Sequence, residues 1–240
     1  MYDIKSSVVI CYGLNGVLEI ALPIILLYYG FRWKNWRVYP VIIGIVAMTL
    51  CGMVRALLRS VLISDSYGFI ERVIASALIG AVCEEGARYL AMRFAMPNND
   101  RLTDAFSYAV GHGGAEMVLT QAYIYPMRLF IVGHRYLDGG DVTDTERLRI
   151  LSESSIFDVI MAGLHNSVEA ALLNLCCSAL ILLAIRFNSR KQYIVLAIAA
   201  HALLNIITVI FGDIFAFIAT IGFCILSYKL CDNYAKENYI

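Results

Sequence analysis

Long apolar runs separated by short polar segments dominate this chain. A helix needs about 20 predominantly apolar residues to cross a bilayer, and seven runs approach or exceed that length. They cover residues 8–29, 38–58, 70–95, 103–132, 156–187, 193–211 and 214–230. Pro126 is expected to kink or end the fourth run. The fifth is longer than one crossing needs, so we expect it to tilt or to begin as an interfacial helix.

This pattern predicts an all-α integral membrane protein with one polytopic domain, residues 1–240, built as a bundle of about seven (7–8) transmembrane helices. Composition agrees, because 60% of the residues are hydrophobic, 16% are charged and the mean hydropathy is +0.71. Soluble domains have about 45–50% apolar and about 25% charged residues. The net charge of zero argues against a nucleic-acid partner, which would require a basic surface. The seven cysteines lie mostly in apolar runs without a C-x-x-C pair, which favours small buried residues over disulfides or a zinc cage.

Basic residues mark three of the connections between the runs. Cytoplasmic loops of membrane proteins are enriched in Lys and Arg. The basic connections follow runs one, three and five, and contain Arg32, Lys34 and Arg37, then Arg93 and Arg101, then Arg186, Arg190 and Lys191. The acid-leaning segment 133–152, read as the longest loop, follows run four. We therefore expect a multi-pass protein of the cell membrane with its N-terminus outside and its C-terminus cytoplasmic, although Arg59 and Arg72 after run two point the other way.

Polar residues inside the runs should meet at one depth. At a rise of 1.5 Å per residue, Glu84, His112 and His201 each lie roughly 15 Å below the cytoplasmic surface. Glu19 in the first run comes out at a similar depth. Scattered polar core residues would not be expected to share a level, so the sequence predicts a polar intramembrane cavity near the cytoplasmic leaflet.

The third run contains two carboxylates and a guanidinium in V-C-E-E-G-A-R-Y. Glu84 and Glu85 lie four and three residues before Arg88, so Arg88 can hold one carboxylate while the other faces the cavity. Each such charge costs roughly 2.5–3.5 kcal/mol on insertion scales and is usually functional. The functional interpretation is a general base that takes a proton from water. The alternative is a structural ion pair that locks two helices together.

Two further pairs have the same helical spacing. His112 and Glu116 can point into one cavity, and Gly111, Gly113 and Gly114 would let another helix approach closely. His112 could position a water or ligate a metal, or it could simply hydrogen-bond across helices.

His201 and Asn205 are i,i+4 as well and suit an oxyanion hole, where donors face a developing negative oxygen. A helix-to-helix hydrogen bond is the alternative for this pair. His165 and Glu169 repeat the spacing in the fifth run and could form a second polar seam or a proton path.

Together these motifs resemble a known pattern. E-E-x-x-R-Y at 84–89, an aromatic-x-x-x-His from Tyr108 to His112 within G-H-G-G-x-E, and His201-x-x-x-Asn205 resemble the YhfC family of intramembrane proteases. That family lies within the CAAX-prenyl-protease and bacteriocin-processing (CPBP, or Abi) group. The resemblance implies that Glu84 or Glu85 is the base for water, oriented by Arg88. It also implies that His112 binds or polarises the water, and that His201 and Asn205 stabilise the oxyanion.

The resemblance implies a peptide or protein substrate, lipidated or membrane-embedded, and two cofactor schemes. We favour a metal-free, glutamate-type scheme slightly; a metal-dependent one would use Zn²⁺ on Glu84, His112 and His201. The chain departs from the broader group, which usually has E-E-x-x-x-R with its arginine at the position of Tyr89. It also has His165-Asn166 and Asn174 where YhfC members often have a Glu-Arg pair and a further histidine.

A non-catalytic protein is the alternative to the peptidase. A transporter subunit, a small-ligand binder, or an immunity or pseudoprotease scaffold could use the same polar cavity. Transporters usually show inverted repeats or broken helix pairs in matching halves, and the sequence shows no such symmetry.

Overall fold

A computed structural model describes residues 2–99, 101–122, 125–186 and 191–238, and the regular elements in these residues are helices. Three short π-helical turns, labelled η, join α-helices. The elements are α1 (Ser6–Trp33), α2 (Val38–Leu62), α3 (Phe69–Leu90), η1 (Ala91–Ala95), α4 (Leu102–Glu116), η2 (Met117–Ala122), α5 (Pro126–Leu137), α6 (Thr145–Glu153), α7 (Ile156–Leu164), η3 (His165–Glu169), α8 (Ala170–Arg186), α9 (Gln192–Phe211) and α10 (Asp213–Asn238).

Five helices of the described chain are long and apolar enough to cross a membrane. They extend over Ser6–Trp33, Val38–Leu62, Ile156–Arg186, Gln192–Phe211 and Asp213–Asn233. The prediction of an all-α protein with several membrane helices is confirmed at this level. The remaining two predicted spans correspond to α3 with η1 and α4 with η2, which contain the charged motifs. The count of seven (7–8) stays a prediction.

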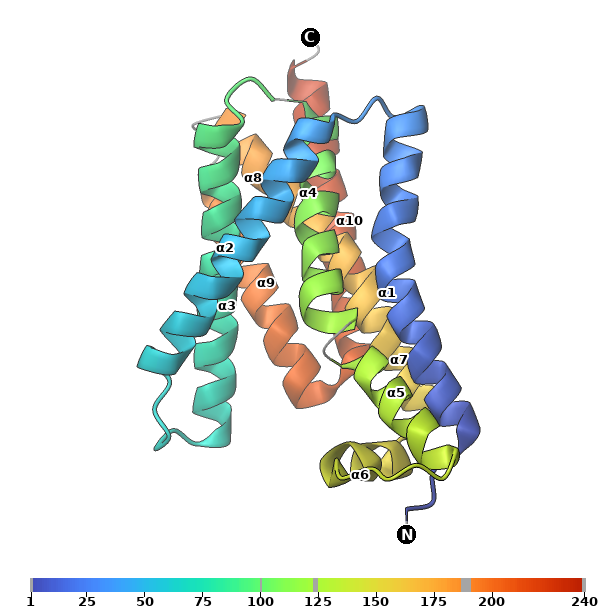
Figure 1. Ribbon diagram of the computed structural model, residues 1–240. Helices are drawn as coiled ribbons and strands as arrows, with labels where there is room; N and C mark the ends of the chain where they lie inside the picture. Colours follow the sequence, from blue (N-terminus) through green and yellow to red (C-terminus); the bar gives the residue numbers. More distant parts are fainter. Residues whose placement is uncertain (1, 100, 123–124, 187–190, 239–240) are drawn as a thin grey trace.

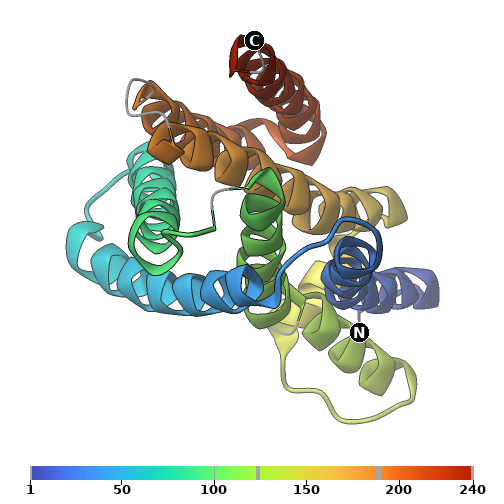
Figure 2. The same cartoon turned by 90° about the horizontal axis from the view of Figure 1, so that it is seen from above.

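The helices surround α4. Helices α1, α2 and α8 all pack against it, and α2 makes the most extensive contact. Seen from above in Figure 2, α4 lies in the middle of the bundle, while α10 lies at its periphery against α8 and α9. The chain ends lie at opposite ends of the molecule, with the α1–α2 connection at the C-terminal end (Figure 1).

Glycines allow this crowding around α4, as the sequence predicted. A Cβ at Gly111 would collide with the Val41 backbone of α2, and one at Gly113 would lie 2.9 Å from Asn174 Nδ2 of α8. A Cβ at Gly114 would lie 2.8 Å from Pro23 Cβ of α1. Each glycine therefore faces a different neighbouring helix, and α4 can occupy the centre only because these side chains are missing.

Pro126 was expected to kink or end the fourth run, and it is the first residue of a separate helix, α5, where its missing N–H costs nothing. One interpretation of the next segment needs correction. The segment 133–152 is more than a loop. It contains α6, whose N-cap Asp144 accepts a hydrogen bond from the Arg147 backbone N–H.

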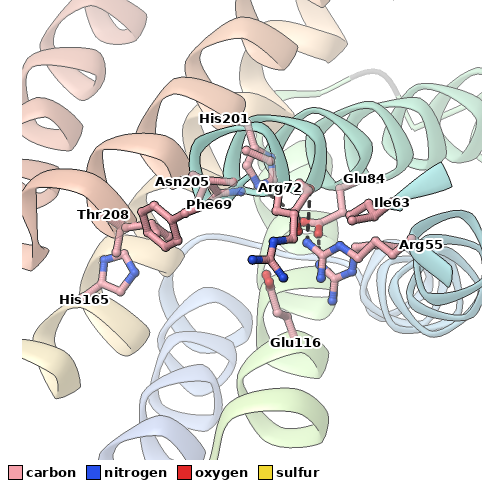
Figure 3. A pocket seen from close by; sticks show the side chains of 15 residues that line it. Arg55, Ile63, Phe69, Arg72, Glu84, Glu116, His165, His201, Asn205 and Thr208 are labelled. Carbon is pink, nitrogen blue, oxygen red and sulfur yellow. Dashed lines mark hydrogen bonds and ion pairs between the residues drawn. The ribbon is translucent and has the colours of Figure 1, made fainter. Parts of the chain in front are cut away.

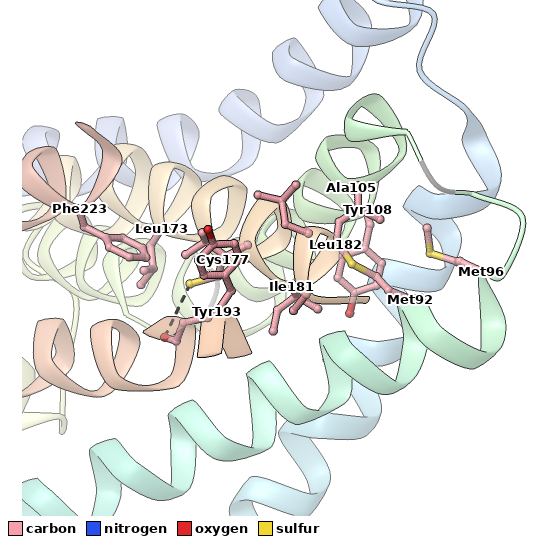
Figure 4. Packing of buried hydrophobic residues seen from close by; sticks show 14 of the residues in the cluster. Met92, Met96, Ala105, Tyr108, Leu173, Cys177, Ile181, Leu182, Tyr193 and Phe223 are labelled. Carbon is pink, nitrogen blue, oxygen red and sulfur yellow. Dashed lines mark hydrogen bonds between the residues drawn. The ribbon is translucent and has the colours of Figure 1, made fainter. Parts of the chain in front are cut away.

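The fifth run forms one continuous helical segment. Helices α7 and α8 join through η3 into residues 156–186 and run obliquely across the bundle (Figure 1). The largest apolar cluster lies where α8 meets α3, α4 and α9. Figure 4 shows Met92, Tyr108, Leu173 and Cys177 in this cluster. A second cluster joins α1 to α5, α6 and α7.

Candidate functional site

An open cavity of about 580 Å³ lies between α2, α3, α9 and the ends of α4 and α7 (Figure 3). Its wall is rich in charged and polar side chains, which come from helices far apart in the sequence. The lining residues are Arg55, Arg59, Ile63, Phe69, Arg72, Val73, Ser76, Ala77, Glu84, Glu116, His165, His201, Asn205, Thr208 and Val209. A smaller cavity of about 60 Å³ adjoins it and shares Glu116, His165, His201 and Asn205.

The cavity has its open end at the α2–α3 connection. Ile63 and Phe69, which flank that connection, line the cavity. In Figure 1 this end is the one that contains the N-terminus, and it is opposite the end with the basic α1–α2 and α3–α4 connections. Glu84 lies deep in the cavity, 15 residues along α3 from Phe69.

The two neighbouring glutamates of α3 have different partners. Glu85 is fully buried, and Arg88 Nη1 donates to both of its oxygens at 2.9 and 2.8 Å. Glu84 lines the cavity, where Arg55 Nη1 bonds its Oε1. The second oxygen of Glu84, Oε2, is buried and has no hydrogen-bond partner in the described residues. Arg88 therefore holds one carboxylate and leaves the other at the cavity.

A buried network continues from Arg88 to two more helices. Arg88 Nη2 donates to Asn174 Oδ1 of α8 at 2.6 Å, and Asn174 Nδ2 donates to Glu116 at 3.5 Å and to the Ala170 carbonyl at 3.0 Å. Glu116 is the last residue of α4 and lines the cavity. Asn174 thus links the fixed ion pair to the cavity wall, a role that sequence reasoning did not assign to it.

His201 bridges the two glutamates. Its Nδ1 lies 2.8 Å from Glu85 Oε1, and its Nε2 lies 3.6 Å from Glu84 Oε2. Asn205, one turn further along α9, lines the cavity beside it. The predicted pair therefore shares one wall with Glu84, but the ring of His201 is already engaged with two carboxylates.

His112 does not line either polar cavity, which corrects the expectation that it shares one with Glu116. It is fully buried, and its Nδ1 lies 3.1 Å from the Tyr108 hydroxyl. The ring packs on Tyr108, with centroids 5.6 Å apart. Its Nε2 is buried and has no hydrogen-bond partner among the described residues. Such an atom requires an explanation, because buried polar groups are almost always paired.

The remaining predicted residues divide into two groups. His165 lines the cavity; its Nδ1 lies 2.7 Å from Glu169 Oε2, and Thr220 donates to Glu169 Oε1 at 2.9 Å. This pair forms a polar wall opposite α2. Glu19 is fully buried in α1 and lines neither polar cavity, so similar depth did not bring it to the site.

Arg55 and Arg59, near the end of the second run, have their side chains in the cavity wall. Arg55 pairs with Glu84, while Arg59 Nη2 donates to the Ser76 carbonyl at 3.2 Å, and both side chains line the cavity. Arg72 lines the same cavity. These arginines are thus not evidence about which loops are cytoplasmic, and the conflict they created with the other basic connections disappears.

The site contains donor atoms of the types that bind metal ions. Glu84 Oε2 and His112 Nε2 are buried without partners, and His201 Nε2 lies next to the first of them. Carboxylate oxygens and imidazole nitrogens are ligands that Zn²⁺ takes. Within the described part of the chain, however, no three His, Cys, Asp or Glu side chains gather closely enough to form an ion-binding cluster.

Comparison with known proteins agrees with this assembly of motifs. The model of the family described as YhfC intramembrane metalloprotease matches residues 18–221. The uncharacterized membrane protein YhfC of Bacillus subtilis (strain 168) is 24% identical over 228 residues, which cover 87% of this chain and 86% of the relative. No solved structure matches. The family match covers most of the chain, including α3, α4 and α9 with their motifs, and the chain therefore belongs to the YhfC intramembrane metalloprotease family.

Proposed function

We propose that this protein is an intramembrane peptidase that hydrolyses a peptide bond with a water activated at Glu84 and His201. One observation carries the proposal. Glu84 Oε2 has no hydrogen-bond partner within the described residues and lies 3.6 Å from His201 Nε2, and both residues line the cavity. A water between these two atoms and a bound peptide would find a proton acceptor at its side.

Glu84 acts as the general base and takes the proton from the attacking water. Arg55 bonds its other oxygen and so fixes the direction in which Oε2 points. Glu85 and Arg88 do not contact the water in this scheme; their role is to position His201 through its Nδ1. The two glutamates have different roles because both oxygens of Glu85 already accept hydrogen bonds from Arg88.

The contact with Glu85 also revises the role of His201. A carboxylate held by arginine accepts hydrogen bonds, so Nδ1 of His201 donates, and the ring in its neutral form would present a bare Nε2. A bare nitrogen accepts a proton or binds a metal; it does not donate to an oxyanion. Asn205, on the same wall, keeps the oxyanion role because its amide N–H groups are donors.

In a metal-dependent alternative, Glu84, His112 and His201 would hold the metal, and Glu84 would then be a ligand instead of the general base. Bound Zn²⁺ would lower the pKa of its water and polarise the peptide carbonyl. The Tyr108 hydroxyl orients the His112 ring, and Glu85 orients that of His201, as supporting partners of metal ligands do. The family description, which names a metalloprotease, supports this alternative.

We further propose a cell-membrane orientation with the N-terminus outside and the C-terminus cytoplasmic. Glu84 lies 11 residues from Ala95, the last residue of η1, so the reaction takes place roughly 16 Å from the cytoplasmic end of the α3–η1 segment. The cavity opens at the opposite end, near Ile63 and Phe69. A peptide or protein substrate, free or membrane-embedded, therefore approaches from the outer end and extends inward to Glu84.

The test uses the purified full chain in nanodiscs, a mixed peptide library and ¹⁸O-labelled water. Hydrolysis should place one ¹⁸O atom in the new carboxyl group of each product, as read by mass spectrometry. Asn205→Ala should lower kcat by about 10²–10³-fold if Asn205 donates to the oxyanion. Asn98→Ala, in an exposed turn outside the cavity, is the matched control and should leave kcat unchanged. Cleavage that Asn205→Ala leaves intact, or a folded protein that cleaves no peptide with or without Zn²⁺, contradicts the proposal.

A further inference from the structure

The outer half of the cavity contains more positive charge than its carboxylates balance. Arg55 is paired with Glu84, but neither Arg59 nor Arg72 forms a salt bridge within the described residues. Arg59 donates only to the Ser76 carbonyl, and its Nε is buried with no hydrogen-bond partner. Arginine stays protonated in proteins, and a partly buried cation without a counter-ion is costly.

The arginines lie along the side of α3 that faces the cavity. Arg72, Ser76 and Glu84 of α3 line the cavity, and Gly80 lies one turn before Glu84. Arg59 Nη2 bonds the Ser76 carbonyl, and a Cβ at Gly80 would lie 3.5 Å from the same nitrogen and 3.9 Å from Arg55 Cδ. The guanidinium of Arg59 thus lies between the cavity opening and Glu84, with Arg72 nearer the opening.

We propose that Arg59 and Arg72 form a binding subsite for a carboxylate of the peptide substrate, either an acidic side chain or the free C-terminal carboxylate. The inference rests on the proposed peptidase function, because the subsite and Glu84 share one cavity. Arginine matches a carboxylate in charge and can bond both of its oxygens. Bound there, the carboxylate would supply the counter-ion and the acceptor that Arg59 Nε lacks.

The geometry also gives a distance between the carboxylate and the scissile bond. Ser76 and Gly80 lie eight and four residues before Glu84, which is about 12 and 6 Å along a helix. An extended peptide advances about 3.3 Å per residue. The carboxylate therefore belongs about two to four residues from the bond that Glu84 acts on. Thr208 and Val209 of α9 form the facing wall of this channel.

Direct binding tests the subsite separately from turnover. The probes are fluorescent peptides that have Asp at one position in turn, each matched by a peptide with Asn at that position. Every peptide is prepared with a free and with an amidated C-terminus. Dissociation constants are measured with the Glu84→Gln protein in nanodiscs, which holds the peptide without turnover. Replacing the carboxylate at the matching position should weaken binding about tenfold or more, as for a hydrogen bond to a charged group. The position that responds distinguishes a side-chain from a C-terminal carboxylate.

The same measurement is repeated with arginine variants. Arg59→Gln should raise the dissociation constant of the acidic peptide about tenfold and leave that of its Asn counterpart unchanged. Arg72→Gln should have the same selective effect but only about threefold, because the Arg72 side chain is exposed. Arg93→Gln removes an exposed arginine outside the cavity and should change neither dissociation constant. Arg59→Lys, which keeps the charge, covers the case in which Arg59→Gln does not fold, and should weaken the acidic peptide less.

Equal affinities for acidic and neutral peptides in the wild-type background, or equal losses for both in Arg59→Gln, would overturn the subsite. So would unchanged peptide binding combined with loss of co-purified anionic lipid, which would assign the arginines to a lipid phosphate. Binding that follows the prediction in a protein without measurable cleavage would retain the subsite and contradict only the peptidase.

Discussion

Two neighbouring residues of α3 face two different parts of the molecule. Behind Glu85 the polar network is closed: Arg88, His201 and Asn174 join three helices, and both oxygens of Glu85 are used. In front of Glu84 the cavity is open, and one oxygen has no partner among the described residues. A closed network gives positional precision, whereas an unused acceptor in a cavity can react. The E-E motif therefore combines a structural carboxylate, Glu85, with a reactive one, Glu84.

The largest expected effect on stability comes from opening the closed side. Glu85→Gln leaves the Arg88 guanidinium, only 1% exposed, without its counter-ion. Breaking a buried ion pair in this way costs about 3–5 kcal/mol of unfolding free energy. Glu84→Gln is the control, because its partner Arg55 has an 18% exposed side chain in the cavity, where water can solvate it, and the loss should be smaller than for Glu85→Gln. Thermal or denaturant unfolding in one detergent measures both; equal losses would mean that the two environments do not differ.

A moderate effect is expected where α4 is held against α2. A Cβ at Gly44 would lie 2.8 Å from the His112 backbone nitrogen and also meet the Tyr108 carbonyl, so Gly44→Ala should cost about 1–3 kcal/mol through overpacking. Gly52, on the same helix, has nothing within 4 Å of an added Cβ. Gly52→Ala should therefore be neutral or stabilise by about 0.5–1 kcal/mol. The same unfolding assay checks this pair of variants, and similar losses for both would contradict the close packing of α2 on α4.

The smallest effect is expected at α6, outside both sides of the site. The backbone N–H of Arg147 bonds the Asp144 carboxylate, and this holds the pKa of Asp144 below its usual value. Because the folded pKa is depressed, the capping contribution is present above the unfolded pKa and is lost as pH falls through the folded one. Amide hydrogen exchange in α6 should therefore accelerate only in strong acid. Asp144→Asn should remove that pH dependence without changing peptide cleavage, and a large change in cleavage would contradict the separation of α6 from the site.

Interactions within one helix could be predicted from the sequence. Arg88 lies one turn after Glu85, and helical spacing alone brings them together. The glycines around His112 predicted close helix packing, and each of the three faces a different neighbouring helix. Long apolar runs likewise predicted the membrane helices, because their length and composition are set by the bilayer rather than by tertiary contacts.

Partners that depend on how helices pack were not predictable in the same way. Arg55 lies in a different helix from Glu84, and nothing local indicates that α2 turns it inward. Arg59 and Arg72 did contain a signal, because they disagreed with the distribution of the other basic residues. His112 and Glu116 share a face of α4, yet one turn separates a position covered by neighbouring helices from one at the cavity. The α6 helix was missed because its polar residues resemble a loop.

The central claim is that Glu84, and not its paired neighbour, acts on the water, and one measurement tests it most directly. This measurement is the peptide-cleavage rate of Glu84→Gln per folded molecule, in nanodiscs and with Zn²⁺ supplied. A general base contributes about 10²–10⁴-fold, so we expect a loss of that size with a melting temperature close to that of the wild type. A folded Glu84→Gln protein that cleaves peptide at the wild-type rate would contradict the account.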